Sequence, residues 1–145
     1  MNRKDKAITY FKQSFNCSQA VFTAFRQEDA IDEKAALRLS TVFGAGVACT
    51  GTGLCGAVSG ALMAISMKYG RQDVCGVDAK LKTYEMAKIF MDDFKTAQGS
   101  CICEDIIKIN IGTQENLKKA ADMKIFETKC LEAVKISADL LEKIL

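Results

Sequence analysis

The chain contains no proline, no tryptophan and no histidine. Without histidine it lacks the side chain that most often serves as a general base and as a metal or haem ligand. Any bound metal ion would therefore have to be held mainly by sulfur. Neither charge is in large excess, because 20 Lys and Arg stand against 18 Asp and Glu. This balance gives no field for nucleic acid or for an anionic membrane surface, so we predict neither partner.

A long continuous apolar run is also missing. Residues 39–67 carry no charge, but the unbroken apolar part begins near Leu54 and covers about 14 residues, whereas a membrane span needs ~20. The Gly51-Thr-Gly53 segment would leave backbone groups unpaired in lipid. We therefore predict a buried core helix and no membrane span. The N-terminus, MNRKDKAITYF, has no apolar signal core, which predicts a cytoplasmic location.

What is present is helical periodicity, and no long segment alternates with period two. Helices are expected over residues 4–15, 17–27, 32–43, 54–69, 78–98, 101–109 and 128–144, with a further segment from 112 to 123. Their expected N-caps are Asn16, Asp32, Ser100 and Thr128. At 145 residues one domain is the natural size. The predicted fold is all-α, a single compact domain over residues 1–145 with six to seven helices.

The predicted bundle is organised around residues 42–70, VFGAGVACTGTGLCGAVSGALMAISMKYG. Its first half is too rich in glycine for an ordinary helix. Its second half predicts a central buried helix that ends at Gly70. Gly56, Gly60 and Ala64 recur every four residues, so another helix can approach closely. Such a row can support close helix packing either within one chain or between two copies of it. A homo-oligomer is therefore one expected assembly.

The expected core faces follow from the same periodicity. In the helix over 32–43 they include Leu39, Val42 and Phe43. In the helix over 78–98 seven residues are expected to face the core: Leu81, Tyr84, Met86, Ala87, Phe90, Met91 and Phe94.

Seven cysteines are many for this length, and their positions are not random. Four predicted helices carry cysteine in the first turn: Cys17, Cys55, the pair Cys101 and Cys103, and Cys130. A helix N-terminus lowers a thiol pKa from ~8.5 toward 3.5–7.5 in favourable cases. A cysteine-rich chain without an export signal is more typical of redox or metal chemistry than of disulfide staples. Against this, free cysteine often behaves as a small buried hydrophobic residue.

The spacing of the cysteines excludes several familiar sites. There is no C-x-x-C, so the thioredoxin motif, c-type haem attachment and the paired C-x-x-C of a zinc ribbon are all missing. The lone Cys101-Ile-Cys103 would point its two sulfurs roughly 200° apart on a helix, because each residue turns ~100°.

Several short segments together resemble one family. Cys55-Gly-Ala-Val-Ser-Gly60 is similar to a C-G-A-x-x-G block, and Asn16-Cys17-Ser-Gln-Ala-Val21 to a first cysteine segment. Gly99-Ser100 with Cys103, and Lys129-Cys130, are similar to a third and a fourth. This combination resembles the C_GCAxxG_C_C family, small proteins to which redox activity is ascribed. The resemblance implies that Cys17, Cys55, Cys103 and Cys130 carry the family role, and that Cys49, Cys75 and Cys101 are additional.

Three functional hypotheses follow. The first is a thiol redox protein, an oxidoreductase in which Cys55 is the activated thiolate, Cys17 resolves it, and Cys103 and Cys130 form a second pair. Its partner would be a redox protein or a small thiol. The second is a binding module in which the same four thiolates hold an iron–sulfur cluster or zinc. The third is a structural helical protein whose cysteines fill the core.

Overall fold

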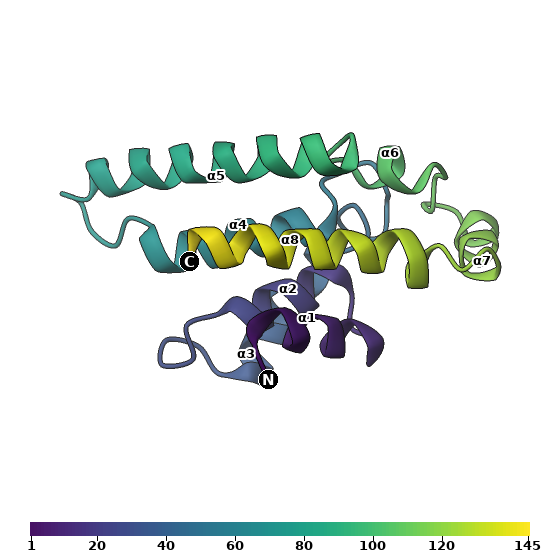
Figure 1. Cartoon of the computed structure of the whole chain (residues 1–145), viewed down its shortest axis with the longest axis horizontal. Coiled ribbons are helices and arrows are strands. Elements are labelled where there is room, and N and C mark those ends of the chain that lie inside the picture. The colour runs from purple at the N-terminus through teal and green to yellow at the C-terminus, as the bar shows by residue number, and fades with distance from the viewer.

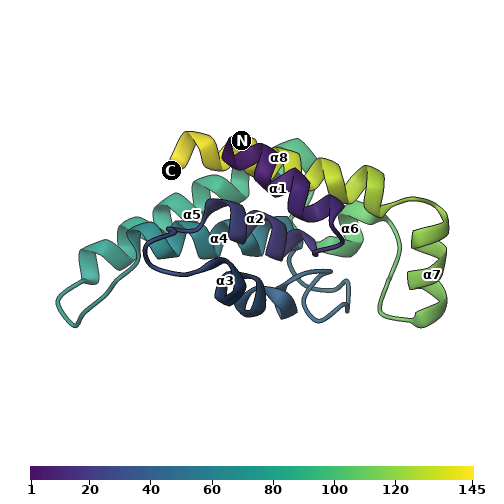
Figure 2. The same cartoon turned by 90° about the horizontal axis from the view of Figure 1, so that it is seen from below.

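The computed structural model describes all residues, 1–145, and the chain is entirely helical apart from one isolated β-bridge. Figures 1 and 2 show the helices stacked into an elongated body, with α7 at one end. A 3₁₀ turn, η1 (Thr41–Phe43), follows α3, and a π-helical turn, η2 (Phe126–Cys130), leads into α8. The α-helices are α1 (Arg3–Lys12), α2 (Cys17–Phe25), α3 (Glu33–Leu39), α4 (Gly56–Tyr69), α5 (Val77–Gln98), α6 (Cys103–Ile107), α7 (Gln114–Asp122) and α8 (Leu131–Ile144). The all-α prediction is therefore confirmed, with eight α-helices instead of six or seven, because the segment after Gly112 forms a helix of its own.

Several helix boundaries follow directly from side-chain caps. The Asn16 side chain accepts a hydrogen bond from the Gln19 N–H, while the Gln19 side chain accepts one from the Asn16 N–H, which is a complete capping box. Asp32 caps α3 through the Ala35 N–H. At the other end, Gly99 stops α5 in the left-handed conformation, with φ of 87°. These start and stop signals were all predicted from the sequence.

The core is built on α4, which packs against α2, α5 and α8. Eight of its 14 residues are buried. Gly60 lets α2 come close, because a Cβ there would lie 2.7 Å from the Ser18 carbonyl oxygen. On another side the Ser137 hydroxyl of α8 donates to the Ala57 carbonyl at 2.7 Å. The row of small residues is thus used inside this chain.

Two predicted core faces were wrong in part, although Phe90 and Phe94 are buried as predicted. Leu81 and Tyr84 are 56% and 55% exposed, because α5 packs on α4 and α8 mainly through its second half, around Phe90 and Phe94. Leu39, Val42 and Phe43 are also exposed. Helix α3 is short and buries only Ala36, since the chain turns into η1 directly after it.

Two predicted helix starts were also wrong. Ser100 does not begin a helix at Cys101, because its hydroxyl donates to Asp105 and accepts from the Ile102 N–H, and α6 begins only at Cys103. Thr128 is not an N-cap either, since its hydroxyl donates back to the Lys124 carbonyl at 2.8 Å. The last helix therefore starts earlier, in the π-helical turn η2.

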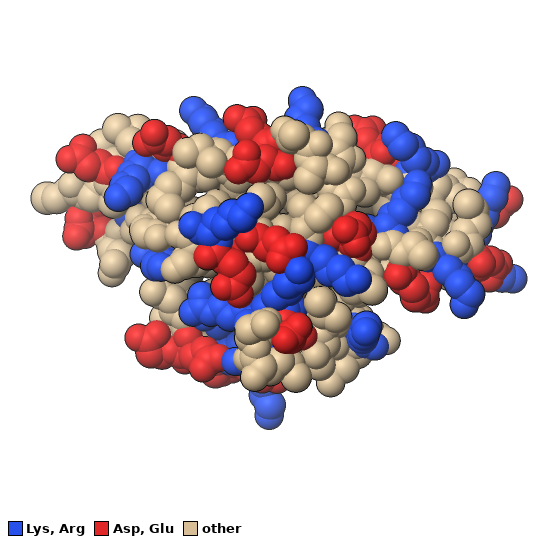
Figure 3. Space-filling view, viewed as in Figure 1, with Lys and Arg blue, Asp and Glu red and all other residues tan.

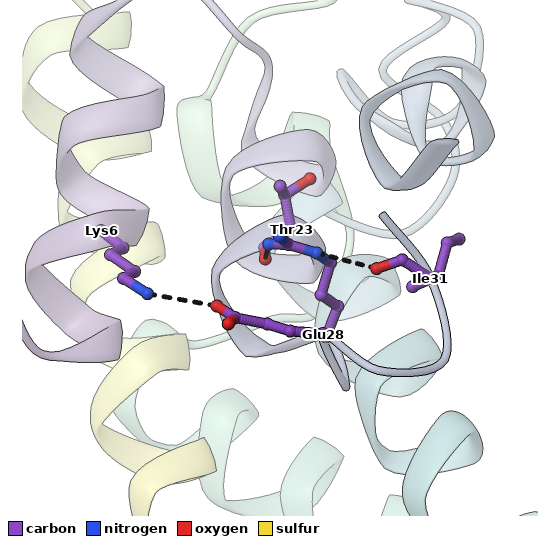
Figure 4. A network of polar contacts seen from close by, with 5 residues as sticks. Lys6, Thr23, Glu28 and Ile31 are labelled. Atoms are coloured by element: carbon purple, nitrogen blue, oxygen red, sulfur yellow. Dashed lines mark hydrogen bonds and ion pairs between the residues drawn. The ribbon is translucent and has the colours of Figure 1, made fainter. Parts of the chain in front are cut away.

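Basic and acidic side chains are interspersed over the face shown in Figure 3. Lys6 pairs with Glu28 at 3.3 Å, and this contact ties α1 to the loop after α2 (Figure 4). In the same loop Arg26 donates to the carbonyl oxygens of Thr23 and Ile31 and so closes the turn between α2 and α3. None of the helices combines the length and the apolar character that a bilayer span requires.

Candidate functional site

Four cysteines from distant parts of the chain line one cavity of about 560 Å³. They are Cys17 at the start of α2, Cys55 before α4, Cys103 at the start of α6, and Cys130 at the end of η2. In both ribbon views α6 and the start of α8 lie toward the end of the molecule that carries α7. The remaining three cysteines, Cys49, Cys75 and Cys101, do not line this cavity. The four cysteines of the motif segments therefore line the cavity, and the three additional cysteines do not.

A short antiparallel contact brings two of these cysteines to the same place. Leu54 and Ile102 form an isolated β-bridge. The Cys55 N–H donates to the Cys101 carbonyl at 2.7 Å, and the Cys103 N–H donates to the Gly53 carbonyl at 3.0 Å. The starts of α4 and α6 are therefore joined through backbone hydrogen bonds immediately beside the two thiols.

Cys130 reaches the cavity through the π-helical turn. Its N–H donates to the Ile125 carbonyl at 3.2 Å, five residues back instead of the usual four. Such single turns often occur at functional sites in helices. As a result, Cys130 lies inside a continuous helical segment and not in a first turn. Cys55 also differs from its prediction, because it is the N-cap residue of α4.

Residues 45–49 form a left-handed turn that contributes Ala45 to the cavity wall. Five consecutive residues, Ala45 to Cys49, have φ between 53° and 72°. Each non-glycine residue in this conformation costs roughly 1–2 kcal/mol. Gly46 is required there, because a Cβ would lie 2.8 Å from the Cys103 Cβ and 2.5 Å from the Gly51 Cα. This strained turn directs the Ala45 N–H toward the Cys17 sulfur.

Cys17 is the thiol whose environment favours ionisation. The adjacent Cys55 thiol and the backbone N–H groups of Ala45, Ser18 and Gly56 outweigh burial and lower the pKa of Cys17 to about 6. Ser18 and Gly56 lie in the first turns of α2 and α4, so two helix N-termini meet at one sulfur.

The other three thiols are held in the neutral form. The interaction with Cys17, followed by burial, raises the pKa of Cys55 well above its ordinary value. Burial raises the pKa of Cys103 to about 12, and it also raises the pKa of Cys130. The sequence suggested Cys55 as the thiolate, whereas the structure places the shift toward ionisation on Cys17. The Cys55 thiol is the largest cause of this shift, and the Ala45 N–H, which adds to it, comes from a loop that no sequence pattern predicted.

This difference predicts a distinct pH profile for alkylation. The rate at which iodoacetamide modifies Cys17 should rise through about pH 6 and level off above it, because only the thiolate reacts. Site-resolved mass spectrometry of the native protein measures this rate. In Cys55→Ala the midpoint should move upward, since the largest cause of the lowered pKa is removed. A Cys17 midpoint at the ~8.5 of an ordinary free thiol would contradict this account.

The four sulfurs do not form a set of metal ligands. No group of three or more Cys, Asp or Glu side chains is placed to hold a metal ion. The cysteines therefore share a cavity without converging on one point, and the geometry gives the predicted Cys₄ metal module no support.

The remaining cavity wall was not identified from the sequence. It is mainly apolar and comes from the end of α1 and the residues after it, the turn at residue 45, α6 and the loop after it, α7, η2 and the start of α8. Four polar residues also contribute, of which Lys12, Ser14 and Glu127 are exposed and mark the opening, whereas Asn16 is half-buried. The apolar lining comprises Phe11, Phe15, Ala45, Ile106, Ile107, Ile111, Leu117, Phe126, Leu131 and Ala133. Only their position around the cysteines shows that they belong to the site.

The fold and the site define a class: a small all-helical protein with four free cysteines around one apolar cavity, one of them poised to ionise. Within that class the chain belongs to the C_GCAxxG_C_C family, whose model, described as "Putative redox-active protein (C_GCAxxG_C_C)", matches residues 15–144. No curated protein and no solved structure matches the chain.

Proposed function

We propose that this protein is a thiol redox protein in which Cys17 and Cys55 interconvert between a dithiol and a disulfide. The observation that carries the proposal is the pairing of the two thiols at the wall of one cavity, where each changes the pKa of the other in the opposite direction. Membership of a family described as redox-active supports the same conclusion.

The opposite shifts give the two sulfurs different roles. The Cys17 thiolate is the nucleophile, because it is ionised at neutral pH. Cys55 keeps its proton as long as Cys17 is negative, since the interaction with Cys17 is the largest cause of its raised pKa. Once the Cys17 sulfur has formed a covalent bond it no longer carries that charge. The N–H of Ala57 then favours the Cys55 thiolate, which attacks the Cys17 sulfur and forms the disulfide.

Cys103 and Cys130 are the two remaining thiols of the cavity, and we infer that they act after the first pair. Both line the same cavity and both have raised pKa values, so they stay protonated while the first pair reacts. We propose that they form the second thiol pair, which exchanges with the Cys17–Cys55 disulfide.

Disulfide mapping tests the proposed pair. The reduced protein, purified without oxygen, is treated with a limiting amount of the thiol oxidant diamide, blocked with N-ethylmaleimide and digested for mass spectrometry. We expect a Cys17–Cys55 disulfide to form first, within the monomer. Cys75→Ser serves as the background, because Cys75 is exposed and would link two chains. The proposal is wrong if Cys17 and Cys55 remain free in folded, diamide-treated protein.

A further inference from the structure

The chemistry of the cavity restricts what can exchange electrons with its thiols. Fourteen of its 18 lining residues are hydrophobic, and only one cation, Lys12, and one anion, Glu127, contribute to it. Its volume of about 560 Å³ is in the range of roughly 300–1,000 Å³ that is usual for pockets holding small organic ligands. The wall therefore suits a compact apolar molecule and offers little to a strongly charged one.

Burial of the reactive sulfurs argues against a direct reaction with a folded protein. Cys17 is 9% exposed and Cys55 is 7% exposed. Thiol–disulfide exchange requires the attacking thiolate to reach the sulfur of its partner, so access limits it. A disulfide on the surface of another folded protein has little access to thiols that are this buried in the wall of a cavity. Glutathione disulfide is a small molecule, but it carries several charged groups. The cavity wall offers only one cation, Lys12, to pair with them.

We propose that the cavity binds a quinone-type molecule, which accepts two electrons from the Cys17–Cys55 dithiol. This inference rests on the proposed function, because it names the electron acceptor of the same thiol pair. A quinone has an apolar ring that matches the aromatic and aliphatic wall, and two carbonyl oxygens that accept hydrogen bonds. The Lys12 ammonium at the opening is the one charged donor of the lining, and it suits an oxygen that becomes more negative on reduction.

The reaction balances without any further reactant. Two thiols and one quinone give one disulfide and one hydroquinone. The two S–H bonds break and one S–S bond forms, so the sulfurs lose two electrons. The quinone gains these electrons together with two protons, which form its two O–H bonds. Because the lowered pKa of Cys17 leaves this thiol ionised at neutral pH, its proton has already gone to solvent, and solvent returns one proton to the reduced quinone.

Duroquinone, tetramethyl-1,4-benzoquinone, is a suitable probe because its ring has no unsubstituted carbon at which a thiol would replace hydrogen. It is mixed without oxygen with the reduced Cys75→Ser protein. We expect one quinone to be consumed for each Cys17–Cys55 disulfide, with a rate that saturates as the quinone concentration rises. At equal concentration, oxidised glutathione should react at least about tenfold more slowly, because the wall has few charged partners for it.

Binding is measured separately from the reaction. The double variant Cys17→Ser, Cys55→Ser cannot form the disulfide, and equilibrium dialysis should show that it still binds duroquinone. Adding Ala133→Phe, which fills the cavity from α8 and replaces no cysteine, should weaken that binding by at least about tenfold. Leu117→Phe is the second filling variant in case the first does not fold, and Leu81→Phe on the exposed side of α5 is the matched control.

The outcomes separate this inference from the proposed function. If diamide forms the Cys17–Cys55 disulfide but duroquinone neither binds saturably nor oxidises the pair, the quinone assignment fails and the thiol function stands. If diamide forms no such disulfide, the thiol function fails. In that case the quinone assignment fails with it, even where duroquinone binds. Binding that the two filling variants leave unchanged also overturns the assignment, since the quinone would then lie elsewhere.

Discussion

Replacing Gly56 by alanine should destabilise the protein by about 3 kcal/mol, because overpacking a tight core typically costs ~1–3 kcal/mol and occasionally more. A Cβ at this position would overlap the Cys17 sulfur. It would also lie 2.8 Å from the Ser18 backbone nitrogen and 2.9 Å from the Gly44 Cα, which are backbone atoms of two other segments and cannot rotate away. The C-G-A-x-x-G block therefore needs its first glycine so that a sulfur can rest on the start of α4.

Thermal and urea unfolding measure this effect, and the midpoint temperature should fall by roughly 10 °C in a domain of this size. Gly76→Ala is the matched control, because its nearest neighbour is the flexible Arg71 side chain and its φ is −79°. In the Cys17→Ala background the cost of Gly56→Ala should decrease, since the overlapping sulfur is gone. Equal costs in both backgrounds would show that the sulfur is not what excludes a side chain at position 56.

The same substitution should change the chemistry of Cys17. The Gly56 N–H is one of the three backbone groups that lower the pKa of this thiol. Moving the start of α4 away from α2 weakens that interaction and also separates Cys55 from Cys17. Stability and thiol reactivity are thus coupled at this glycine, which explains how one small residue belongs to both the fold and the site.

Local sequence signals determined much of the fold. Asn16 and Gln19 specify the start of α2, Asp32 specifies the start of α3, and Gly99 ends α5, and in each case the bonds involved join residues close in sequence. The errors lie where distant contacts decide. Leu81 is apolar and correctly spaced for a core residue, yet no other helix covers it.

The candidate site, too, was predictable from the sequence only in part. The four cysteines were recognisable from their motif segments, and their common cavity follows only from the tertiary structure. Which of them ionises depends on three non-local features: the contact of Cys17 with the Cys55 thiol, the left-handed turn at residues 45–49 and the contact of Cys17 with the start of α4. None of them has a periodic signature, and five successive residues with positive φ run against every local preference. Tertiary packing imposes that turn, so a local reading of the sequence could not have found it.

Removing the sulfur of Cys17 should have the largest effect on reactivity. In Cys17→Ala the rate of oxidation at neutral pH should fall by about 30-fold or more, because the attacking species is the thiolate and a thiol with the ordinary pKa of ~8.5 is only about 3% ionised at pH 7. Cys17 has a pKa of about 6 and is mostly ionised there, whereas Cys103 has a pKa of about 12 and is almost entirely protonated. No remaining cysteine of the cavity supplies a comparable thiolate, although the pKa of Cys55 should fall toward its ordinary value once Cys17 is gone.

Cys55→Ala should fail at a different step, and the comparison of the two variants separates the roles of the sulfurs. Cys17 still forms a covalent bond in this variant, so a mixed disulfide should accumulate when the reduced protein meets a small uncharged aromatic disulfide such as 2,2′-dipyridyl disulfide. Intact-mass spectrometry detects the trapped adduct, and release of 2-thiopyridone gives the rate. Cys101→Ala is the matched control, because Cys101 is half-buried but lies outside the cavity, and it should react as the unmodified protein does. If Cys55→Ala lost the first step and Cys17→Ala retained it, the nucleophile would be Cys55, and the roles assigned to the two sulfurs would have to be exchanged.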